Sequence, residues 1–269
     1  MSLDIPEDAL IKTAHAMADA ARAAVLPYFR ASDLQSDNKE LDGFDPVTEA
    51  DRDAEAAMRA VLAERRPDDG ILGEEEADRP GTSGLTWIID PIDGTRGFIS
   101  GTPTWGVLIA LSAGADPIYG LIDQPYIGER FEGGFGRAHM TGPMGVAGLA
   151  VRQGRTLSNA TLFTTFPEIG TAQERAGFEA VAAEVQLVRY GMDCYAYALL
   201  AGGHVDLVIE AGLNAYDIAA PVALVEAAGG IVTDWLGGPA YNGGRALAAA
   251  TPSLHRDAMK IVQRAGGFG

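Results

Sequence analysis

The sequence contains a single cysteine, Cys194, so it has no second thiol with which to form an internal disulfide. No apolar run approaches the ~20 residues that a membrane-spanning helix needs. The acidic N-terminus also lacks the basic and apolar regions of a secretory signal. These absences predict a cytoplasmic protein that folds in a reducing compartment and does not insert into a membrane.

Basic residues are scarce as well. The chain has 20 Lys and Arg against 37 Asp and Glu, a formal net charge of −17. This charge gives no attraction to nucleic acid, which is therefore not expected as a partner. A small phosphorylated substrate remains compatible with the charge, because bound divalent cations reverse its sign locally. With 269 residues, 47% of them hydrophobic, the chain can build a sizeable core in one large or two small domains.

Two amphipathic helices are expected near the N-terminus. Apolar residues recur every three or four positions over residues 7–30, and again from Thr48 to about Pro67. Thr48 is a plausible N-cap and Asp51 stands at the N3 position, so the simplest interpretation of Asp51 is a capping acid. The polar segment 32–44 between the helices is expected to be a loop.

Strands are expected over residues 71–73 and 87–89, and an antiparallel meander over residues 105–111, 117–123 and 129–135. Glycine-rich sequence from Gly133 to Gly154 then indicates a domain boundary. We therefore expect an N-terminal α+β domain over residues 1–143 and a C-terminal α/β domain over residues 144–269.

The second half alternates between strand and helix patterns. Strands are expected over residues 160–164, 186–189, 204–210, 231–233 and 246–250, with helices over residues 171–184, 193–201, 215–228 and 253–265. Such alternation predicts helices packed on a sheet. The helix at 215–228 is apolar almost all round and should be buried. Asp217 near its start is then unfavourable unless it caps the helix, is paired or binds a cation.

The most distinctive stretch runs from Trp87 to Pro103. Its first three residues are apolar and predict the end of a buried strand, which we expect Pro91 to stop because proline cannot donate to a sheet. Asp90 and Asp93 flank that end. Two carboxylates beside free backbone N–H groups suit a hard cation and an anion, although an ordinary Asp-Pro and Asp-Gly turn has the same pattern.

Similar alternatives apply to the acidic run at residues 74–76. Three adjacent acids usually form a solvated surface. This run, however, follows the apolar segment 71–73 just as Asp90 follows its own apolar segment, so one of its carboxylates could be directed to the same place.

Taken together, these motifs resemble the inositol monophosphatase family of Mg²⁺-dependent, lithium-sensitive phosphatases. Four motifs in the same order across almost the whole chain are a specific signal of this family, whereas a lone Asp-Gly-Thr motif would be a weak one. They favour functional roles for these residues over capping and turn formation alone. The matching residues are Asp45-Pro-Val-Thr-Glu-Ala-Asp51, Gly73-Glu74-Glu75, Trp87-Ile-Ile-Asp-Pro-Ile-Asp-Gly-Thr95, and Glu210 with Asp217, Ala219-Ala220 and Glu226-Ala-Ala-Gly-Gly230.

The resemblance implies a fold of the α+β or α/β class, a layered α-β-α-β-α sandwich of the inositol monophosphatase/fructose bisphosphatase type. The site would lie between the two halves, and the protein would be a homodimer. Two or three Mg²⁺ per site would be the cofactors. By position, the metal ligands would be Glu74, Asp90, the carbonyl of Ile92, Asp93 and Asp217.

The same resemblance implies the catalytic and substrate-binding residues. Thr95, hydrogen-bonded towards Asp51 and helped by Glu74, would orient and deprotonate the attacking water. The backbone N–H groups of Gly94 and Thr95 would hold the phosphate beside Asp93. Glu210 would contact the alcohol portion of the substrate.

This chemistry needs no histidine or cysteine nucleophile, because cations lower the pKa of water and neutralise the leaving group. Accordingly, the four histidines are scattered without ligand spacing, and Cys194 is expected in the core.

Two departures within the family point to particular members. Arg96-Gly97-Phe98 follows Asp-Gly-Thr, and Gly191-Met-Asp-Cys-Tyr-Ala-Tyr197 replaces the small residues usual in inositol phosphatases. Both patterns resemble the histidinol-phosphate phosphatases of this fold. Asp193 and Glu210 would then face an amino alcohol that carries an ammonium and an imidazole, because acids suit a cation better than a neutral polyol.

Other roles remain open for these polar residues. Asp193 could instead cap its helix. Arg96 and Arg189 could assist the phosphate, cross a subunit interface, or stay ordinary surface charges. The pattern also does not decide whether Lys39, in the loop at 32–44, reaches the site.

The sequence therefore predicts a Mg²⁺-dependent phosphomonoesterase that hydrolyses histidinol phosphate in histidine biosynthesis. An inositol monophosphatase or a broad-range sugar phosphatase of the same family is the alternative. A metal-binding protein that has lost turnover is a rival from another class. Thr95, Asp51 and Glu74 speak against that rival, because binding alone needs no group that activates water.

Overall fold

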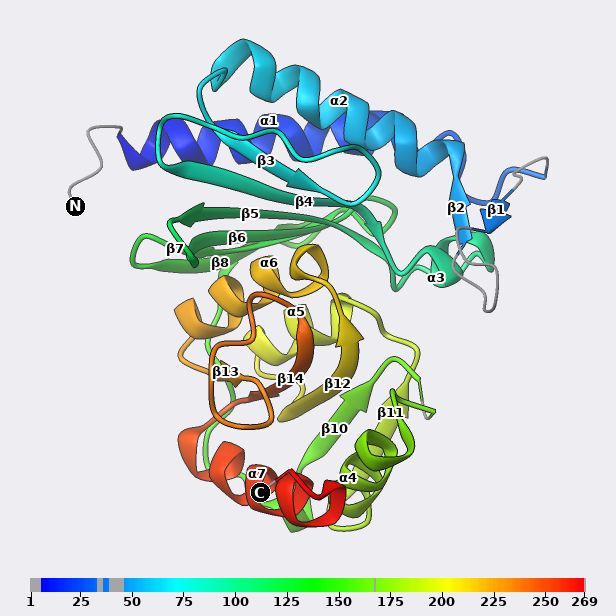
Figure 1. The fold of residues 1–269 in the computed structure, drawn as a ribbon, viewed down its shortest axis with the longest axis vertical. Coiled ribbons are helices and arrows are strands. Elements are labelled where there is room, and N and C mark those ends of the chain that lie inside the picture. The colour runs from blue at the N-terminus through cyan, green and yellow to red at the C-terminus, as the bar shows by residue number, and fades with distance from the viewer. Residues whose placement is uncertain (1–5, 33–35, 39–45, 167, 269) are drawn as a thin grey trace.

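The computed structural model describes residues 6–32, 36–38, 46–166 and 168–268. Figure 1 shows layers stacked along the long axis of the molecule in the order helices, sheet, helices, second sheet, helices. The predicted α-β-α-β-α sandwich is therefore confirmed. None of the described helices combines the length and hydropathy that crossing a membrane requires.

The first sheet comes entirely from residues 70–148, and its edge strand β3 is parallel to its neighbour β4. The remaining strands form an antiparallel meander, as predicted. Its strands, in spatial order, are β3 (Gly70–Gly73), β4 (Leu85–Asp93), β5 (Gly106–Ala113), β6 (Asp116–Gln124), β7 (Glu129–Gly134), β8 (Arg137–Gly142) and β9 (Gly145–Gly148).

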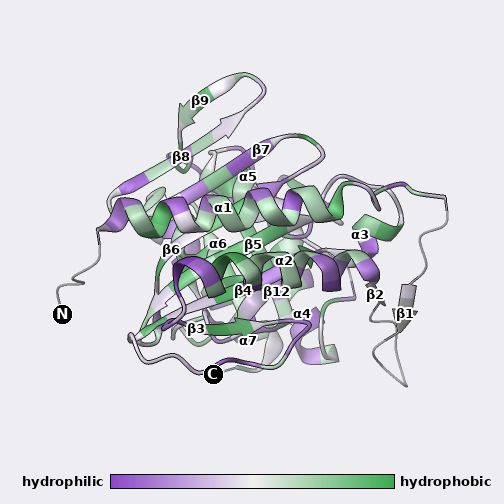
Figure 2. Ribbon diagram, turned by 90° about the horizontal axis from the view of Figure 1, so that it is seen from above, coloured by the Kyte–Doolittle hydropathy of each residue, from purple (hydrophilic) through white to green (hydrophobic). Residues whose placement is uncertain are grey.

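Helices α1 (Glu7–Val25) and α2 (Glu49–Arg65) cover the outer face of this sheet, and Figure 2 looks down onto them. Their apolar stripes bury residues such as Leu10, Met17 and Met58 against β4 and β5. A short hairpin of β1 (Ser36–Asn38) and β2 (Pro46–Thr48) precedes α2. Part of the expected loop at 32–44 is therefore extended strand.

The second sheet is mixed, with the order β11-β10-β12-β14-β13. Helices α5 (Tyr195–Ala201) and α6 (Ala215–Ala227) lie between the two sheets, while α4 (Ala172–Ala182) and α7 (Pro252–Gly266) cover the far face. A short 3₁₀ helix spans Leu157–Asn159. The strands are β10 (Thr161–Thr164), β11 (Leu187–Tyr190), β12 (Leu207–Leu213), β13 (Ile231–Thr233) and β14 (Gly244–Ala249).

The central layer explains the composition of α6. Residues on every side of this helix are buried, because one side packs on the first sheet and the other on the second. The largest apolar cluster accordingly joins Leu108 and Ile122 of the first sheet to Ile218 of α6 and Val208 of β12. The expectation that this helix is buried is confirmed.

Two expectations about the first half need correction. Pro91 does not stop β4, which continues to Asp93 through a register shift opposite β5, where Asp93 pairs with Gly106. A bulge of this kind accommodates a residue that lacks an N–H donor. The meander also extends beyond the expected strands, so the boundary between residues 143 and 144 falls in the turn joining β8 to β9. The division into two domains stays a prediction.

Candidate active site

A cavity of about 440 Å³ lies between the two halves of the fold. Its walls come from β4 and α3 (Thr95–Ile99) in the first half, and from the ends of β10 and β12 with α5 and α6 in the second. Most residues that the sequence assigned to a site line this cavity: Glu74, Asp90, Ile92, Asp93, Gly94, Thr95, Arg96, Asp193, Glu210 and Asp217.

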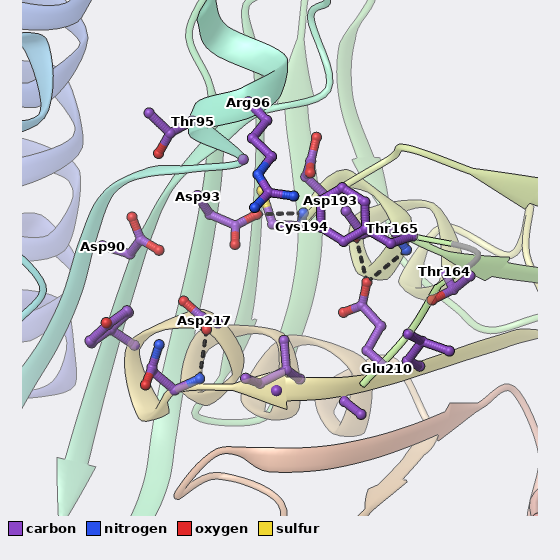
Figure 3. Close-up of a pocket in the computed structure, with 18 of the residues that line it drawn as sticks. Asp90, Asp93, Thr95, Arg96, Thr164, Thr165, Asp193, Cys194, Glu210 and Asp217 are labelled. Carbon is purple, nitrogen blue, oxygen red and sulfur yellow. Dashed lines mark hydrogen bonds between the residues drawn. The ribbon is translucent and has the colours of Figure 1, made fainter. Parts of the chain in front are cut away.

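Three aspartates meet at one side of the cavity. Asp90 and Asp93 come from the bulged end of β4 and Asp217 from the first turn of α6 (Figure 3), and one oxygen of each lies within 4.8 Å of the others. Burial, together with the neighbouring carboxylates, raises the pKa of Asp90 and Asp93 well above the usual range. Burial also raises the pKa of Asp217 to about 6.

Backbone N–H groups hold each of these carboxylates. The N–H of Ile92 donates to Asp90 Oδ1 over 3.0 Å, and the N–H of Cys194 donates to Asp93 Oδ2 over 2.6 Å. The N–H of Asn214 donates to Asp217 Oδ2 over 2.6 Å, which completes a capping box. Asp217 therefore caps its helix and also belongs to the cluster, so the two roles considered for it coexist.

Glu74 reaches the cavity from the turn that follows β3. This turn is held by Glu55, a fully buried residue of α2 that accepts hydrogen bonds from the N–H groups of Glu75 (2.8 Å) and Glu76 (3.0 Å). Gly73 is required there, because a Cβ would lie 2.3 Å from Glu55 Oε1. Sequence reasoning missed Glu55, although its place on the apolar face of α2 beside Met58 was a signal.

Asp51 is buried and is not among the residues that line the cavity. Its Oδ2 accepts hydrogen bonds from the N–H (2.7 Å) and Oγ1 (2.6 Å) of Thr48, which confirms the predicted capping box. Its Oδ1 is buried without a hydrogen-bond partner, and burial raises the pKa of Asp51 to about 6. The structure thus leaves one oxygen of this acid available for a second role.

The expected hydrogen bond between Thr95 and Asp51 is not formed. Thr95 is the first residue of α3, and its Oγ1 donates back to the carbonyl of Ile92 over 3.2 Å. Asp51 Oδ1 remains unpartnered in this arrangement. Thr95 nevertheless lines the cavity beside the aspartate cluster (Figure 3).

Gly94 and Asp193 are packed against each other. Gly94 adopts a φ of 85°, and a Cβ on it would lie 2.6 Å from Asp193 Cγ, so glycine is needed for two reasons. Asp193 Oδ2 accepts a hydrogen bond of 2.8 Å from Thr104 Oγ1. The alternative that Asp193 caps its helix is wrong, because α5 starts at Tyr195 and Cys194 is its N-cap.

Glu210 is also held by several donors. Its Oε1 accepts from the N–H (3.1 Å) and Oγ1 (2.5 Å) of Thr165, and its Oε2 accepts from Tyr197 OH (2.8 Å). Burial raises the pKa of Glu210 despite these hydrogen bonds. Thr165 was not identified from the sequence, and Tyr197 was noted only as part of the motif at 191–197, because their hydrogen bonds to Glu210 depend on contacts between separate elements.

The two arginines occupy different places. Arg96 lines the cavity, and its guanidinium lies 4.7 Å from the ring centroid of Phe166. Arg189 is exposed on the edge strand β11 and is not among the lining residues. A role in the phosphate site is therefore not apparent for Arg189 within one chain. Lys39 lies outside the described residues.

The donor set of the cavity suits a hard divalent cation. Carboxylate oxygens supply the ligands that Mg²⁺ prefers, and a bound cation would relieve the repulsion among three close carboxylates. No histidine lies among the described residues of the wall, and Cys194 contacts the site through its backbone. The arrangement therefore fits metal-assisted hydrolysis better than nucleophilic catalysis by His or Cys.

An α-β-α-β-α sandwich with an acidic cavity between its halves is the arrangement expected of the sandwich-type metal-dependent phosphatases. A model of the inositol monophosphatase family matches residues 7–266, and the chain belongs to that family. The chain is 39% identical to an inositol monophosphatase from Zymomonas mobilis of known structure. The alignment has a TM-score of 0.85 and covers 96% of this chain and 99% of that one.

Two curated relatives carry more specific names. The chain is 41% identical to the chloroplastic bifunctional phosphatase IMPL2 of Arabidopsis thaliana over 87% of its own length, but spans only 66% of that protein. It is 34% identical to a histidinol-phosphatase of Chlorobaculum parvum, covering 91% of this chain and 93% of that protein. Members of the family are metal-dependent enzymes that act on small phosphorylated substrates.

Proposed function

We propose that this protein is a Mg²⁺-dependent phosphomonoesterase that hydrolyses histidinol phosphate to histidinol and phosphate. The observation that carries the choice of substrate is the pair of carboxylates, Asp193 and Glu210, on the wall of the cavity. An amino alcohol that bears an ammonium and an imidazole gains from such acids, whereas a neutral polyol does not. The relatives named histidinol-phosphatase support the same choice.

Five groups would hold the cations: the carboxylates of Glu74, Asp90, Asp93 and Asp217, and the carbonyl of Ile92. Two or three Mg²⁺ are expected. When bound, they would lower the pKa of water and neutralise charge on the leaving oxygen. The oxygen donors and their close spacing support Mg²⁺ over a softer metal.

The protein groups would then position the reactants. The N–H groups of Gly94 and Thr95 would hold the phosphate, and Thr95, with Asp51 and Glu74, would orient and deprotonate the attacking water. The water oxygen bonds to phosphorus, the bond from phosphorus to the alcohol oxygen breaks, and the alcohol leaves with a proton. The buried, unpartnered Oδ1 of Asp51 supports this assignment, because it is an acceptor without a donor.

A second candidate is hydrolysis of an inositol phosphate or another sugar phosphate. The similarity to the inositol monophosphatase from Zymomonas mobilis favours it, since it extends over almost the whole of both chains. The proposed mechanism would be unchanged, and only the alcohol would differ.

Phosphate release decides between the two substrates. Histidinol phosphate and inositol monophosphate are compared with Mg²⁺, and an EDTA control fixes the background. A preference of ~100-fold for histidinol phosphate, about 2.7 kcal/mol of transition-state discrimination, is the expected result. A preference for the inositol ester would establish the second candidate. No release above the EDTA control from either ester would favour a binding protein without turnover.

The family resemblance also leads us to propose a homodimer in the cytoplasm. Equilibrium sedimentation of the full chain gives its mass in solution, and a monomer over the concentration range of the assay would contradict the dimer.

A further inference from the structure

Two residues beyond the end of β10, Phe166 and Glu168, line the cavity but have no role in the proposed mechanism. They follow Thr164 and Thr165 in the chain, and Figure 3 shows these two threonines on the side of the cavity opposite Asp90. If the phosphate is held at the aspartate cluster, the alcohol extends towards this side. The residues that meet the alcohol therefore include Phe166 and Glu168.

The acids on this side of the cavity differ in how many hydrogen bonds they already accept. Asp193 accepts a hydrogen bond from Thr104, and Glu210 is held by Thr165 and Tyr197 on both of its oxygens. Glu168 is exposed, and among the described residues it makes no hydrogen bond or ion pair. Its carboxylate can therefore turn to a ligand without breaking an existing contact.

Phe166 supplies a surface of a different kind beside this acid. This residue is 43% exposed, and the guanidinium of Arg96, from the other half of the fold, lies 4.7 Å from the centroid of its ring. A cation–π contact of this geometry stabilises the position of the ring. The cavity thus presents the aromatic ring of Phe166, which Arg96 contacts, and beside it the carboxylate of Glu168, which has no hydrogen bond or ion pair among the described residues.

We propose that Glu168 and Phe166 select phosphate esters of alcohols that carry an ammonium group and a planar ring. Glu168 pairs with the ammonium, and Phe166 packs against the ring. The selection rests on the proposed phosphatase function. It adds two specificity-determining residues that lie outside the metal cluster and outside the phosphate site.

The test compares Glu168→Gln with the wild type on histidinol phosphate and inositol monophosphate, each with Mg²⁺. The measured quantity is the ratio of kcat/KM for the cationic ester to kcat/KM for the neutral one. We expect this ratio to fall about tenfold, mainly through KM, as for a lost charge-assisted hydrogen bond. Glu179→Gln, an exposed acid on α4, is the matched control and leaves the ratio unchanged.

Two further readouts separate selection from a structural role. The difference between wild type and Glu168→Gln should shrink as salt rises, because a partly exposed ion pair is screened. Phe166→Tyr should retain the preference that Phe166→Leu reduces, since tyrosine keeps the ring and leucine keeps only the apolar character.

The outcomes are distinct for this proposal and for the proposed function. A wild type that prefers histidinol phosphate, with an unchanged ratio in Glu168→Gln, overturns the selection and leaves the function standing. A wild type without that preference overturns the proposed substrate, while a tenfold lower ratio in Glu168→Gln still supports the selection. If neither ester is hydrolysed, calorimetry with free histidinol and free inositol gives the same comparison, and equal affinities of both variants overturn the selection.

Discussion

The backbone N–H of Cys194 donates a hydrogen bond of 2.6 Å to Oδ2 of Asp93, which lies 101 positions earlier in the chain. Asp93 ends β4 in the first sheet, and Cys194 precedes α5 in the layer between the sheets. The same short segment carries Asp193, which packs against Gly94. One tertiary contact therefore aligns a proposed metal ligand, a proposed phosphate contact and a proposed substrate contact.

Replacing Asp93 with asparagine should separate metal binding from folding. The amide oxygen can still accept from Cys194, so the fold should persist, but the lost charge weakens cation binding. We expect phosphate release to fall by roughly 1000-fold, since several kcal/mol of charge stabilisation depend on the cations. Mg²⁺ should raise the Tm of the wild type but not that of the variant. Asp257→Asn on α7 is the control, and near-normal activity of Asp93→Asn would refute the metal assignment.

Asp51 offers a test that distinguishes capping from catalysis. The amide oxygen of asparagine at this N3 position can accept from Thr48 as the carboxylate does, so Asp51→Asn should keep the hydrogen bonds to Thr48 and nearly the wild-type Tm. It cannot accept a proton, so kcat should fall by roughly 10²–10⁴. Asp51→Ala should lose both the turnover and the hydrogen bonds to Thr48, and with those bonds about 1 kcal/mol of stability. Unchanged turnover in Asp51→Asn would leave Asp51 with the capping role alone.

Local patterns predicted the secondary structure well where local physics decides it. The apolar periodicity located α1 and α2 to within a few residues at most ends, and the Thr48–Asp51 capping box formed as expected. Pro91 was misjudged because its effect depends on the partner strand. Opposite β5, the chain forms a bulge at this proline instead of ending, and this bulge brings Asp93 to the cluster.

The residues missed in the sequence gain their importance from distant contacts. Thr104 holds Asp193 across 89 positions, and Glu55 holds the turn after β3 from a different element. No periodicity or spacing within one segment records such pairs. Phe166 is similar, because its position beside Arg96 exists only once the two halves of the fold are packed together.

Glu55 provides a test of how the turn carrying Glu74 is supported. Glu55→Gln replaces an acceptor oxygen that faces backbone N–H donors and Arg59 with an NH₂ group. A buried donor left facing another donor should reduce the free energy of unfolding by about 1–3 kcal/mol. Urea unfolding measures this change. Glu64→Gln, exposed on the same helix, should stay within about 0.5 kcal/mol of the wild type, and equal stability of the two variants would remove Glu55 from this role.

His255 predicts how stability depends on pH. It is buried on α7 with Nε2 at 2.8 Å from Thr233 Oγ1, and burial lowers the pKa of its imidazole from the ordinary value of 6.5. The unfolded chain therefore binds a proton at a higher pH than the folded protein does. The stability that comes from keeping the imidazole of His255 neutral in the folded protein is complete above pH 6.5. It is lost as the pH falls below that value towards the folded-state pKa.

The measurement is the free energy of unfolding at about pH 7.5 and about pH 5.5, for the wild type and for His255→Gln. Glutamine can bond to Thr233 but does not titrate, so the wild type should lose more stability on acidification than this variant. Carboxylates with raised pKa values, such as Asp51 and Asp217, contribute to both proteins and cancel in the difference. His204→Gln, at an exposed site, should follow the wild type. Parallel curves for wild type and His255→Gln would show that burial of this imidazole does not couple folding to pH.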